Sequence, residues 1–242
     1  MAHLAWSQAS RPFVRLVYFG NMLLILKSGL RAALCDTAIW NIWQRRRDKR
    51  QIAAWIKAGK PIPPPSSVKR RILSNYGVAR SLHCFVETGT LHGDTPSVLK
   101  DQFKAIYSIE LSEELARKAV RRFRAYPNIH IVQGDSGERL AEIMNDISSP
   151  ALIWLDGHYS AGITARSGIN CPIVQELASI FSHSIKDHVI LIDDARHFNG
   201  TNDYPTIEEL RDIFARERPN YDFSVSSDLI RAVPGSPVAD PF

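Results

Sequence analysis

The chain has 242 residues, 45% of them hydrophobic and 23% charged, with a formal net charge of +5. This composition is ordinary for a globular protein and excludes a wholly disordered chain, a collagen or a disulfide scaffold. The three cysteines, Cys35, Cys84 and Cys171, lie far apart and show no CxxC spacing. The sequence therefore predicts neither a disulfide framework nor a zinc site, and it favours a reducing compartment.

The charge is unevenly distributed along the chain. Residues 1–82 contain 15 Lys and Arg against 2 Asp and Glu, whereas the remaining 160 residues contain 15 against 23. A basic segment joined to an acidic body is typical of a chain whose first part meets an anionic partner. The prolines at 61–65 form a stiff spacer. We therefore expect a basic amphipathic helical arm with a Pro-rich linker over 1–65, and the main domain over 66–242.

The arm combines apolar residues with cations. Residues 16–26 form an apolar run too short to cross a membrane, which takes about 20 residues; a signal peptide is the rival interpretation. Trp40, Trp43 and Trp55 flank a group of Arg and Lys at 45–50, as in helices that lie on anionic membranes. The alternatives are a helix packed on the body or on a second subunit of a homo-oligomer, and a nucleic-acid contact. We expect a cytoplasmic protein, peripheral at the inner membrane face where the arm binds lipid.

The body alternates short apolar runs with helical segments. The predicted strands are 83–87, 105–110, 129–133, 151–156, 189–193, 221–226 and 229–233. The predicted helices are 66–80, 93–101, 112–125, 136–147, 172–183 and 206–216, the last opened by a capping box of Thr206 and Glu209. Strands separated by helices predict a parallel sheet covered on both faces. Two final strands with no helix between them predict an antiparallel hairpin at one edge.

Acidic residues follow nearly every predicted strand. They would meet at the carboxyl edge of the parallel sheet, where ligands bind in such folds. Gly89 permits a tight turn after the first strand, and Gly93 a close approach of backbone to ligand. Glu110 is placed to accept hydrogen bonds from both hydroxyls of a ribose. The segments at the strand ends are Glu87-Thr88-Gly89-Thr90, Glu110, Asp135-Ser136, Asp156-Gly157-His158 and Asp193-Asp194.

Two adenosine cofactors share this layout, a nicotinamide dinucleotide and S-adenosylmethionine. A pyrophosphate favours GxGxxG and a bare helix N-terminus, whereas this chain has Glu87 at the turn and Asp94 just beyond it. These carboxylates would repel a pyrophosphate but suit a sulfonium that carries an amino group. The sequence therefore favours S-adenosylmethionine. Asp135 would cap the following helix. In the methyltransferase layout it would accept from the adenine amine, and it can do both.

The runs FVETGTxxG, YSIELS, QGDSGE, WLDGHYS and HVILIDDAR together resemble a bacterial branch of the class I S-adenosylmethionine-dependent methyltransferases, over about residues 66–234. The resemblance implies an α/β, Rossmann-like three-layer sandwich with a seven-stranded, mostly parallel sheet whose last strand is antiparallel. It also implies where the cofactor binds. The candidate cofactor-binding residues are Glu87, Thr88, Gly89, Thr90, Gly93, Glu110, Asp135, Ser136 and Asp156.

Asp156-Gly157-His158, together with Asp193-Asp194, is similar to the metal-dependent macrocin-type sugar O-methyltransferases, which have Asp-Gly-x-His where this chain has Asp-Gly-His. Neighbouring strands lie about 4.8 Å apart, so Asp156, Asp193 and Asp194 could share one Mg²⁺. The metal would lower the pKa of a substrate hydroxyl, and His158 would take its proton. His158 and Asp156 are thus the catalytic candidates. The alternative is that Asp193-Asp194 caps a turn and Asp156 holds the amino group of the cofactor.

We therefore expect a methyltransferase that uses S-adenosylmethionine, assisted by Mg²⁺, to methylate an oxygen of a sugar, glycan or other polar small molecule. Residues 159–170 would form a substrate loop. One alternative is a nucleic-acid methyltransferase, which is disfavoured because the segment after the fourth strand lacks the D/N-P-P-Y/F run of base methylases. The other is a non-catalytic, membrane-associated protein that binds the cofactor.

Overall fold

The computed structural model describes residues 38–157 and 171–242. Its helices are α2 (Ala38–Lys57), α3 (Ser66–Ala79), α4 (Asp94–Leu99), α5 (Glu113–Phe123), α6 (Ser136–Asp146), α7 (Ile173–Ser182) and α8 (Ile207–Glu217), with a short 3₁₀ turn at Ala195–His197. Its strands are β1 (Cys84–Thr88), β2 (Ala105–Glu110), β3 (Ile129–Gln133), β4 (Ala151–Leu155), β5 (Val189–Ile192), β6 (Tyr221–Ser226) and β7 (Leu229–Pro234). The predicted elements of the body are confirmed to within a few residues at their ends. The run at 16–26, His158 and the predicted substrate loop lie outside the described residues.

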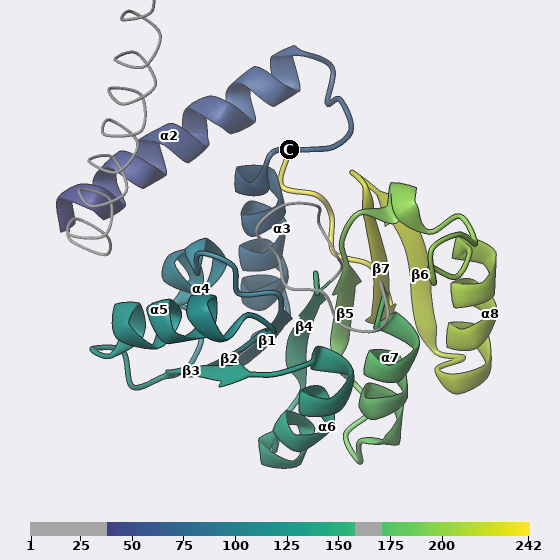
Figure 1. Ribbon diagram of the computed structural model, residues 1–242. Coiled ribbons are helices and arrows are strands. Elements are labelled where there is room, and N and C mark those ends of the chain that lie inside the picture. The colour runs from purple at the N-terminus through teal and green to yellow at the C-terminus, as the bar shows by residue number, and fades with distance from the viewer. Residues whose placement is uncertain (1–37, 158–170) are drawn as a thin grey trace, which may run out of the picture. The chain divides into compact units, whose positions relative to one another are not determined.

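The strands form one seven-stranded sheet in the order β3-β2-β1-β4-β5-β7-β6 (Figure 1). The pairs among β1 to β5 are parallel, and β7 is antiparallel to both β5 and β6. The predicted hairpin at one edge is confirmed, with its second strand inserted next to β5 and its first strand outermost. The Rossmann-like fold class predicted from the sequence is thus the observed one.

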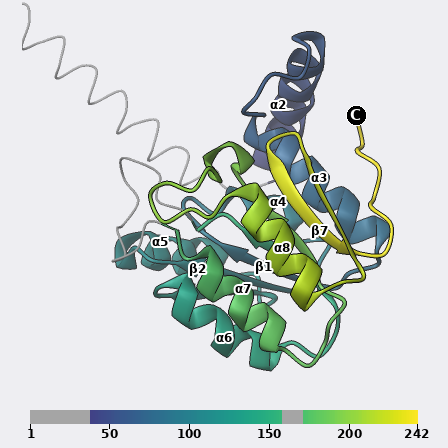
Figure 2. The same ribbon diagram turned by 90° about the vertical axis from the view of Figure 1, so that its right-hand side faces the viewer.

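Both faces of the central strands are buried, which explains their continuous apolar runs. Successive residues of β4 alternate between two apolar clusters: Leu152 and Trp154 face one, and Ile153 and Leu155 the other. The first cluster contains residues of α3, α4 and α5, and the second contains residues of α6, α7 and α8. Figures 1 and 2 show these two sets of helices on opposite faces of the sheet, which makes the three layers.

Side chains fix where several helices begin. The Ser112 hydroxyl accepts from the Leu115 N–H at the start of α5, and Asp135 accepts from the Gly137 N–H at the start of α6. The predicted capping box at Thr206 and Glu209 is present at the start of α8. These caps satisfy N–H groups that a first helical turn leaves without partners.

The chain divides into two compact units at residues 46 and 47, within α2. The sequence placed the domain boundary at residue 65, and the difference has a physical cause. Trp55 is only 5% exposed, its Nε1 donates to the Pro61 carbonyl at 2.8 Å, and its ring contacts Phe242. The second half of α2 and the proline segment therefore belong with the body. None of the helices in 38–157 and 171–242 is long and apolar enough to span a membrane.

Candidate functional site

The sheet register brings the strand-end residues to one edge. Thr88 of β1 pairs with Leu155 of β4, and Leu155 pairs with Ile192 of β5. The residues that follow these strands must therefore lie side by side, and the Asp193 N–H indeed donates to the Leu155 carbonyl at 3.0 Å. Asp156 and Asp193 are neighbours because the parallel register continues one residue past the strands.

The turn after β1 is locked against the end of β4. Gly89 has φ +95°, and a Cβ at this position would lie 2.7 Å from the backbone carbonyl oxygen of Asp156. The Thr88 hydroxyl accepts from the N–H groups of Asp156 and Gly157 at 3.1 and 3.0 Å. Glycine is therefore required at position 89 for two reasons. The backbone has a positive φ, and it lies so close to the Asp156 carbonyl that a side chain would not fit. Thr88 uses its hydroxyl to hold the β4 end.

Glu110, at the end of β2, organises the same turn. Its carboxylate accepts from the Leu91 N–H at 2.7 Å and from the Ser112 N–H at 2.9 Å, one on each oxygen. The side chain is buried, with 6% of its surface exposed. Each carboxylate oxygen has a second lone pair, so Glu110 can accept ribose hydroxyls while it holds the turn.

Glu87 lies beneath the turn, fully enclosed. The Ser108 hydroxyl donates to its carboxylate at 2.6 Å, and Thr90 lies 2.5 Å from that hydroxyl. Burial raises the pKa of Glu87 from 4.5 to about 8, a rise that the Ser108 hydrogen bond moderates. Glu87 therefore carries a proton at neutral pH until a cation approaches it.

The raised pKa of Glu87 predicts a pH-dependent stability. Between pH 4.5 and 8 the unfolded chain has released this proton and the folded chain has not, so the free energy of unfolding should fall as pH rises, by about 1.4 kcal/mol per pH unit. Urea unfolding of the wild type and of Glu87→Gln at pH 5, 6.5 and 8 measures the difference. The variant should lose less stability than the wild type over this range. Parallel curves would contradict the assignment.

The corner after β3 and β4 holds a further buried carboxyl group, which the sequence did not indicate. Glu176 of α7 is fully buried, and burial raises its pKa to about 7, moderated by the hydroxyls of Ser136 and Thr88. A Cβ on Gly157 would lie 3.1 Å from the Ser136 hydroxyl. Glu176 thus lies close to Asp135 and Ser136, and it comes from a helix rather than from a strand end.

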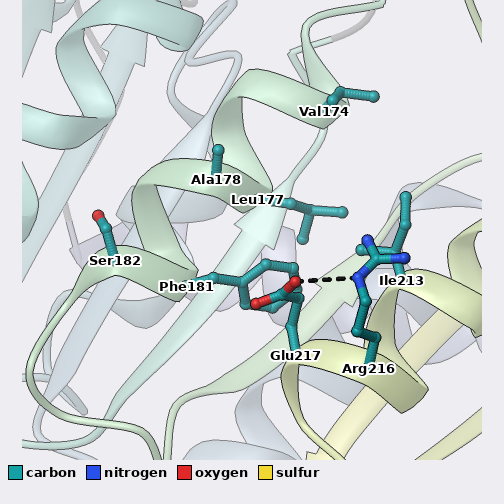
Figure 3. A pocket seen from close by; sticks show the side chains of 8 residues that line it. All are labelled: Val174, Leu177, Ala178, Phe181, Ser182, Ile213, Arg216 and Glu217. Carbon is teal, nitrogen blue, oxygen red and sulfur yellow. Dashed lines mark hydrogen bonds and ion pairs between the residues drawn. The ribbon is translucent and has the colours of Figure 1, made fainter.

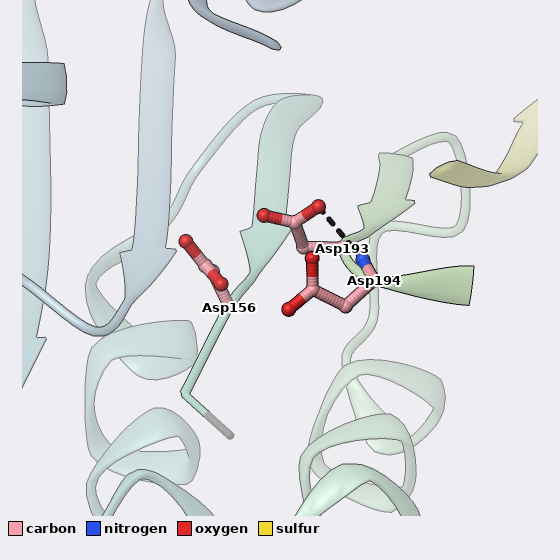
Figure 4. Close-up of side chains that lie close together, drawn as sticks. All are labelled: Asp156, Asp193 and Asp194. Carbon is pink, nitrogen blue, oxygen red and sulfur yellow. Dashed lines mark hydrogen bonds between the residues drawn. The ribbon is translucent and has the colours of Figure 1, made fainter. Parts of the chain in front are cut away.

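Asp156, Asp193 and Asp194 form a triad whose oxygens lie within 4.8 Å of one another (Figure 4). Asp194 has φ +55°, and its N–H donates to Asp193 at 2.7 Å. Burial and the charge of Asp193 raise the pKa of Asp156 well above its usual range. Burial also raises the pKa of Asp193, to about 6, against the effect of Lys69. Sequence reasoning predicted this triad, and the structure brings all three side chains together.

A lysine that the sequence did not single out lies among these acids. The Lys69 ammonium, from α3, is 2.6 Å from an Asp193 oxygen and 3.0 Å from an Asp194 oxygen. Arg196 contacts Asp194 at 2.9 Å. Burial opposes ionisation of Asp194, but Lys69 and Arg196 hold its pKa below its usual range. Three carboxylates suit Mg²⁺ by chemistry, yet a metal at this place would have to displace Lys69.

A pocket of about 280 Å³ connects the turn after β1 to this triad. Its walls come from α3, residues 89–92, the start of α4, Trp154 and the three aspartates. A second pocket, between α7 and α8, has mainly apolar walls, and its Arg216 and Glu217 pair with each other at 3.1 Å (Figure 3). The first pocket is therefore the candidate site, since it joins the glycine turn to the charged groups.

The chain matches no protein-family model and no curated protein. Solved structures do resemble it. The O-methyltransferase TomG from Streptomyces achromogenes, involved in tomaymycin synthesis and solved with S-adenosylmethionine, aligns with a TM-score of 0.53 at 14% identity, over 78% of this chain and 89% of that one. A candidate caffeoyl-CoA O-methyltransferase from Staphylococcus aureus aligns with a TM-score of 0.50 at 11% identity, over 84% and 100%. An O-methyltransferase from Bacillus cereus aligns at 0.48 and 16%, over 77% and 90%. At these identities the likeness concerns the fold alone: the chain has a Rossmann-like fold similar to that of these structures.

Proposed function

We propose that this chain transfers a methyl group from S-adenosylmethionine to an oxygen of a sugar, glycan or other polar small molecule. The observation that carries the proposal is one pocket in which the Gly89 turn, held by Glu110, meets the acidic triad. The fold it shares with an O-methyltransferase that binds S-adenosylmethionine supports the same cofactor. The substrate class rests on the polar, charged lining of the pocket and on the resemblance of the motifs.

The charges around the turn favour S-adenosylmethionine over a dinucleotide. Glu87 lies under the turn, and Asp94 at the start of α4 pairs with Arg122 at 3.2 Å. A pyrophosphate would meet the Asp94 carboxylate and would leave Glu87 protonated, whereas the cationic amino group of S-adenosylmethionine would pair with Glu87 as Glu87 gives up its proton. Glu110 would hold the ribose, and Asp135, whose carboxylate also caps α6, would accept from the adenine amine.

The transfer itself is a single displacement. An acceptor oxygen forms a bond to the methyl carbon as the carbon–sulfur bond breaks, the electron pair stays on sulfur, and the hydroxyl proton leaves to a base. The sequence names His158, two residues after Asp156, as that base. The protein's part is to align the oxygen with the sulfonium and to stabilise the charge that develops on it. The sequence also predicts Mg²⁺ on Asp156, Asp193 and Asp194, but the Lys69 ammonium contacts two of these carboxylates, so the proposed transfer includes no step through a metal.

The proposal is tested by incubating the full chain with radiolabelled S-adenosylmethionine and a panel of acceptors. The panel contains sugars, glycans and small polyhydroxylated compounds, with single-stranded and duplex oligonucleotides as the competing class. Label should appear on an oxygen of a small acceptor. Label on a nucleobase would replace the proposal with the nucleic-acid alternative. Tight cofactor binding without transfer to any acceptor would favour a non-catalytic binding protein.

We further propose that the basic arm attaches the protein to anionic membranes. On α2, Ile42 and Trp43 are about half exposed, and the exposed cations Arg45, Arg46, Lys49 and Arg50 follow them. Each cation near an anionic leaflet contributes about 1 kcal/mol, and exposed Trp side chains are typical of membrane interfaces.

Changing the four exposed cations of α2 to Gln should therefore release the full-length protein from vesicles that contain phosphatidylserine. The measurement is co-sedimentation at low and physiological salt. A matched control changes four exposed cations of the body, Lys104, Arg117, Arg121 and Arg124, to Gln, which removes the same charge and should leave pelleting intact. Equal pelleting of all three proteins, or of none, would refute the membrane role.

A further inference from the structure

We propose that Lys69 is the resident cation of the acceptor site, so that methyl transfer by this chain needs no divalent metal. The inference rests on the proposed function and concerns how its acceptor oxygen is held. The Lys69 ammonium contacts Asp193 and Asp194, two of the three carboxylates that would hold a metal ion. Lys69 would then position the acceptor oxygen and stabilise the negative charge that develops on it.

The position of Lys69 is fixed by the packing of α3. Ile72 and Leu73, three and four residues further on, share its face of the helix and are 0% and 1% exposed in the core. The Lys69 side chain is 16% exposed, and its partner Asp193 is 3% exposed. The packing of α3 in the core therefore fixes one positive charge beside the triad. Lys69 lines the same pocket as the Gly89 turn.

Two of the three carboxylates that a metal would need already accept hydrogen bonds. Asp193 accepts from both Lys69 and the Asp194 N–H. Asp194 uses one oxygen, Oδ1, for both Lys69 and Arg196. A divalent ion bound here would lie beside an ammonium at close range, where like charges repel strongly in a partly buried site. Mg²⁺ also requires near-octahedral oxygen ligands at about 2.0–2.1 Å, so it would compete with Lys69 for Asp193 and Asp194.

The ammonium has a donor to spare for the acceptor. It carries three N–H bonds, and its hydrogen bonds to Asp193 and Asp194 use two of them. The third can be given to an acceptor oxygen in the pocket. As that oxygen loses its proton and attacks the methyl carbon, a fixed positive charge at hydrogen-bond distance favours the transition state over the neutral hydroxyl. In metal-dependent enzymes, the metal ion stabilises this negative charge.

The experiment is a calorimetric titration of the chelator-treated full chain with Mn²⁺ and with Mg²⁺. The wild type should bind neither ion at the triad. Lys69→Met, which keeps the length of the side chain and removes its charge, should gain one Mn²⁺ site per chain, at least roughly tenfold tighter than any wild-type binding. Lys69→Arg should restore the wild-type result. Lys104→Met, at an exposed lysine of the body, is the matched control and should bind no metal.

One tight Mn²⁺ site in the wild type that Asp194→Asn removes would overturn the proposal, and so would identical titrations of wild type and Lys69→Met. Thermal melts of each variant confirm folding, and the wild-type titration decides the main point even if Lys69→Met fails to fold. Affinity for S-adenosylmethionine, measured in parallel, distinguishes failure of the proposed function from failure of the role of Lys69. If the wild type does not bind the cofactor, the proposed function is refuted. If the wild type binds both the cofactor and a metal ion at the triad, only the role of Lys69 is refuted.

Discussion

Replacing Glu110 with Ala is expected to weaken binding of S-adenosylmethionine by about 1.5–3 kcal/mol, the usual contribution of hydrogen bonds to a charged group. The structure gives two reasons for a large effect. Glu110 is the acid at the end of β2 that would accept the ribose hydroxyls. It also accepts the N–H groups of Leu91 and Ser112, so its loss loosens the turn that the cofactor would contact.

The two contributions of Glu110 can be separated by calorimetry on a second variant. Glu110→Gln keeps one carbonyl acceptor and most of the shape, so it should lose less affinity than Glu110→Ala. Glu113→Ala removes an acid three residues away whose side chain is 76% exposed, and it should bind the cofactor as the wild type does. Wild-type affinity in Glu110→Ala would remove Glu110 from the cofactor site.

Gly89→Ala is expected to have the largest effect of any single substitution at the site. A non-glycine residue in the left-handed region costs about 1–2 kcal/mol. The new Cβ would also lie 2.7 Å from the Asp156 carbonyl oxygen, and backbone cannot move aside as a flexible side chain can. Together these should lower the free energy of unfolding by roughly 2–5 kcal/mol and reduce cofactor binding below detection.

The matched control is Gly59→Ala. Gly59 has φ +82°, close to the +95° of Gly89, but a Cβ there would have no atom within 4 Å. Urea unfolding of the two variants therefore separates backbone strain from the clash. Gly59→Ala should lose only the strain contribution and should bind the cofactor normally. Equal destabilisation by both substitutions would mean that the approach of Gly89 to Asp156 is not close in solution.

The fold could be predicted from the sequence because local patterns and tertiary structure agree in the body. The strands at 105–110, 129–133 and 221–226 have the predicted bounds, since each is a short apolar or alternating run between clear turn and capping residues. The acids at the strand ends could be predicted to converge because a parallel sheet aligns its carboxyl ends. That rule places Asp156 beside Asp193 without any knowledge of side-chain packing.

Site residues that lie on helices could not be predicted, because their positions depend on how the helices pack. Lys69 is one of several cations in a basic segment, and only the packing of Ile72 and Leu73 decides that it faces the triad. Glu176 likewise depends on how α7 packs over β4. The compact units divide at residues 46 and 47, ahead of the predicted boundary at 65, because a proline run marks a break in the helix, whereas the burial of Trp55 sets where the packed unit begins.

The central claim is that the edge formed by Glu87, Gly89 and Glu110 binds S-adenosylmethionine. Its most direct test is calorimetric titration of the full-length chain with S-adenosylmethionine and, separately, with NAD, at the same pH and salt. We expect one S-adenosylmethionine per chain, with no comparable binding of NAD, because the turn lacks the GxGxxG pattern that a pyrophosphate favours and has Asp94 at the start of α4. Repeating the titration in buffers of different ionisation enthalpy should show release of a proton, as Glu87 ionises beside the amino group of the cofactor. Tighter binding of NAD, or no binding of S-adenosylmethionine, would contradict the account.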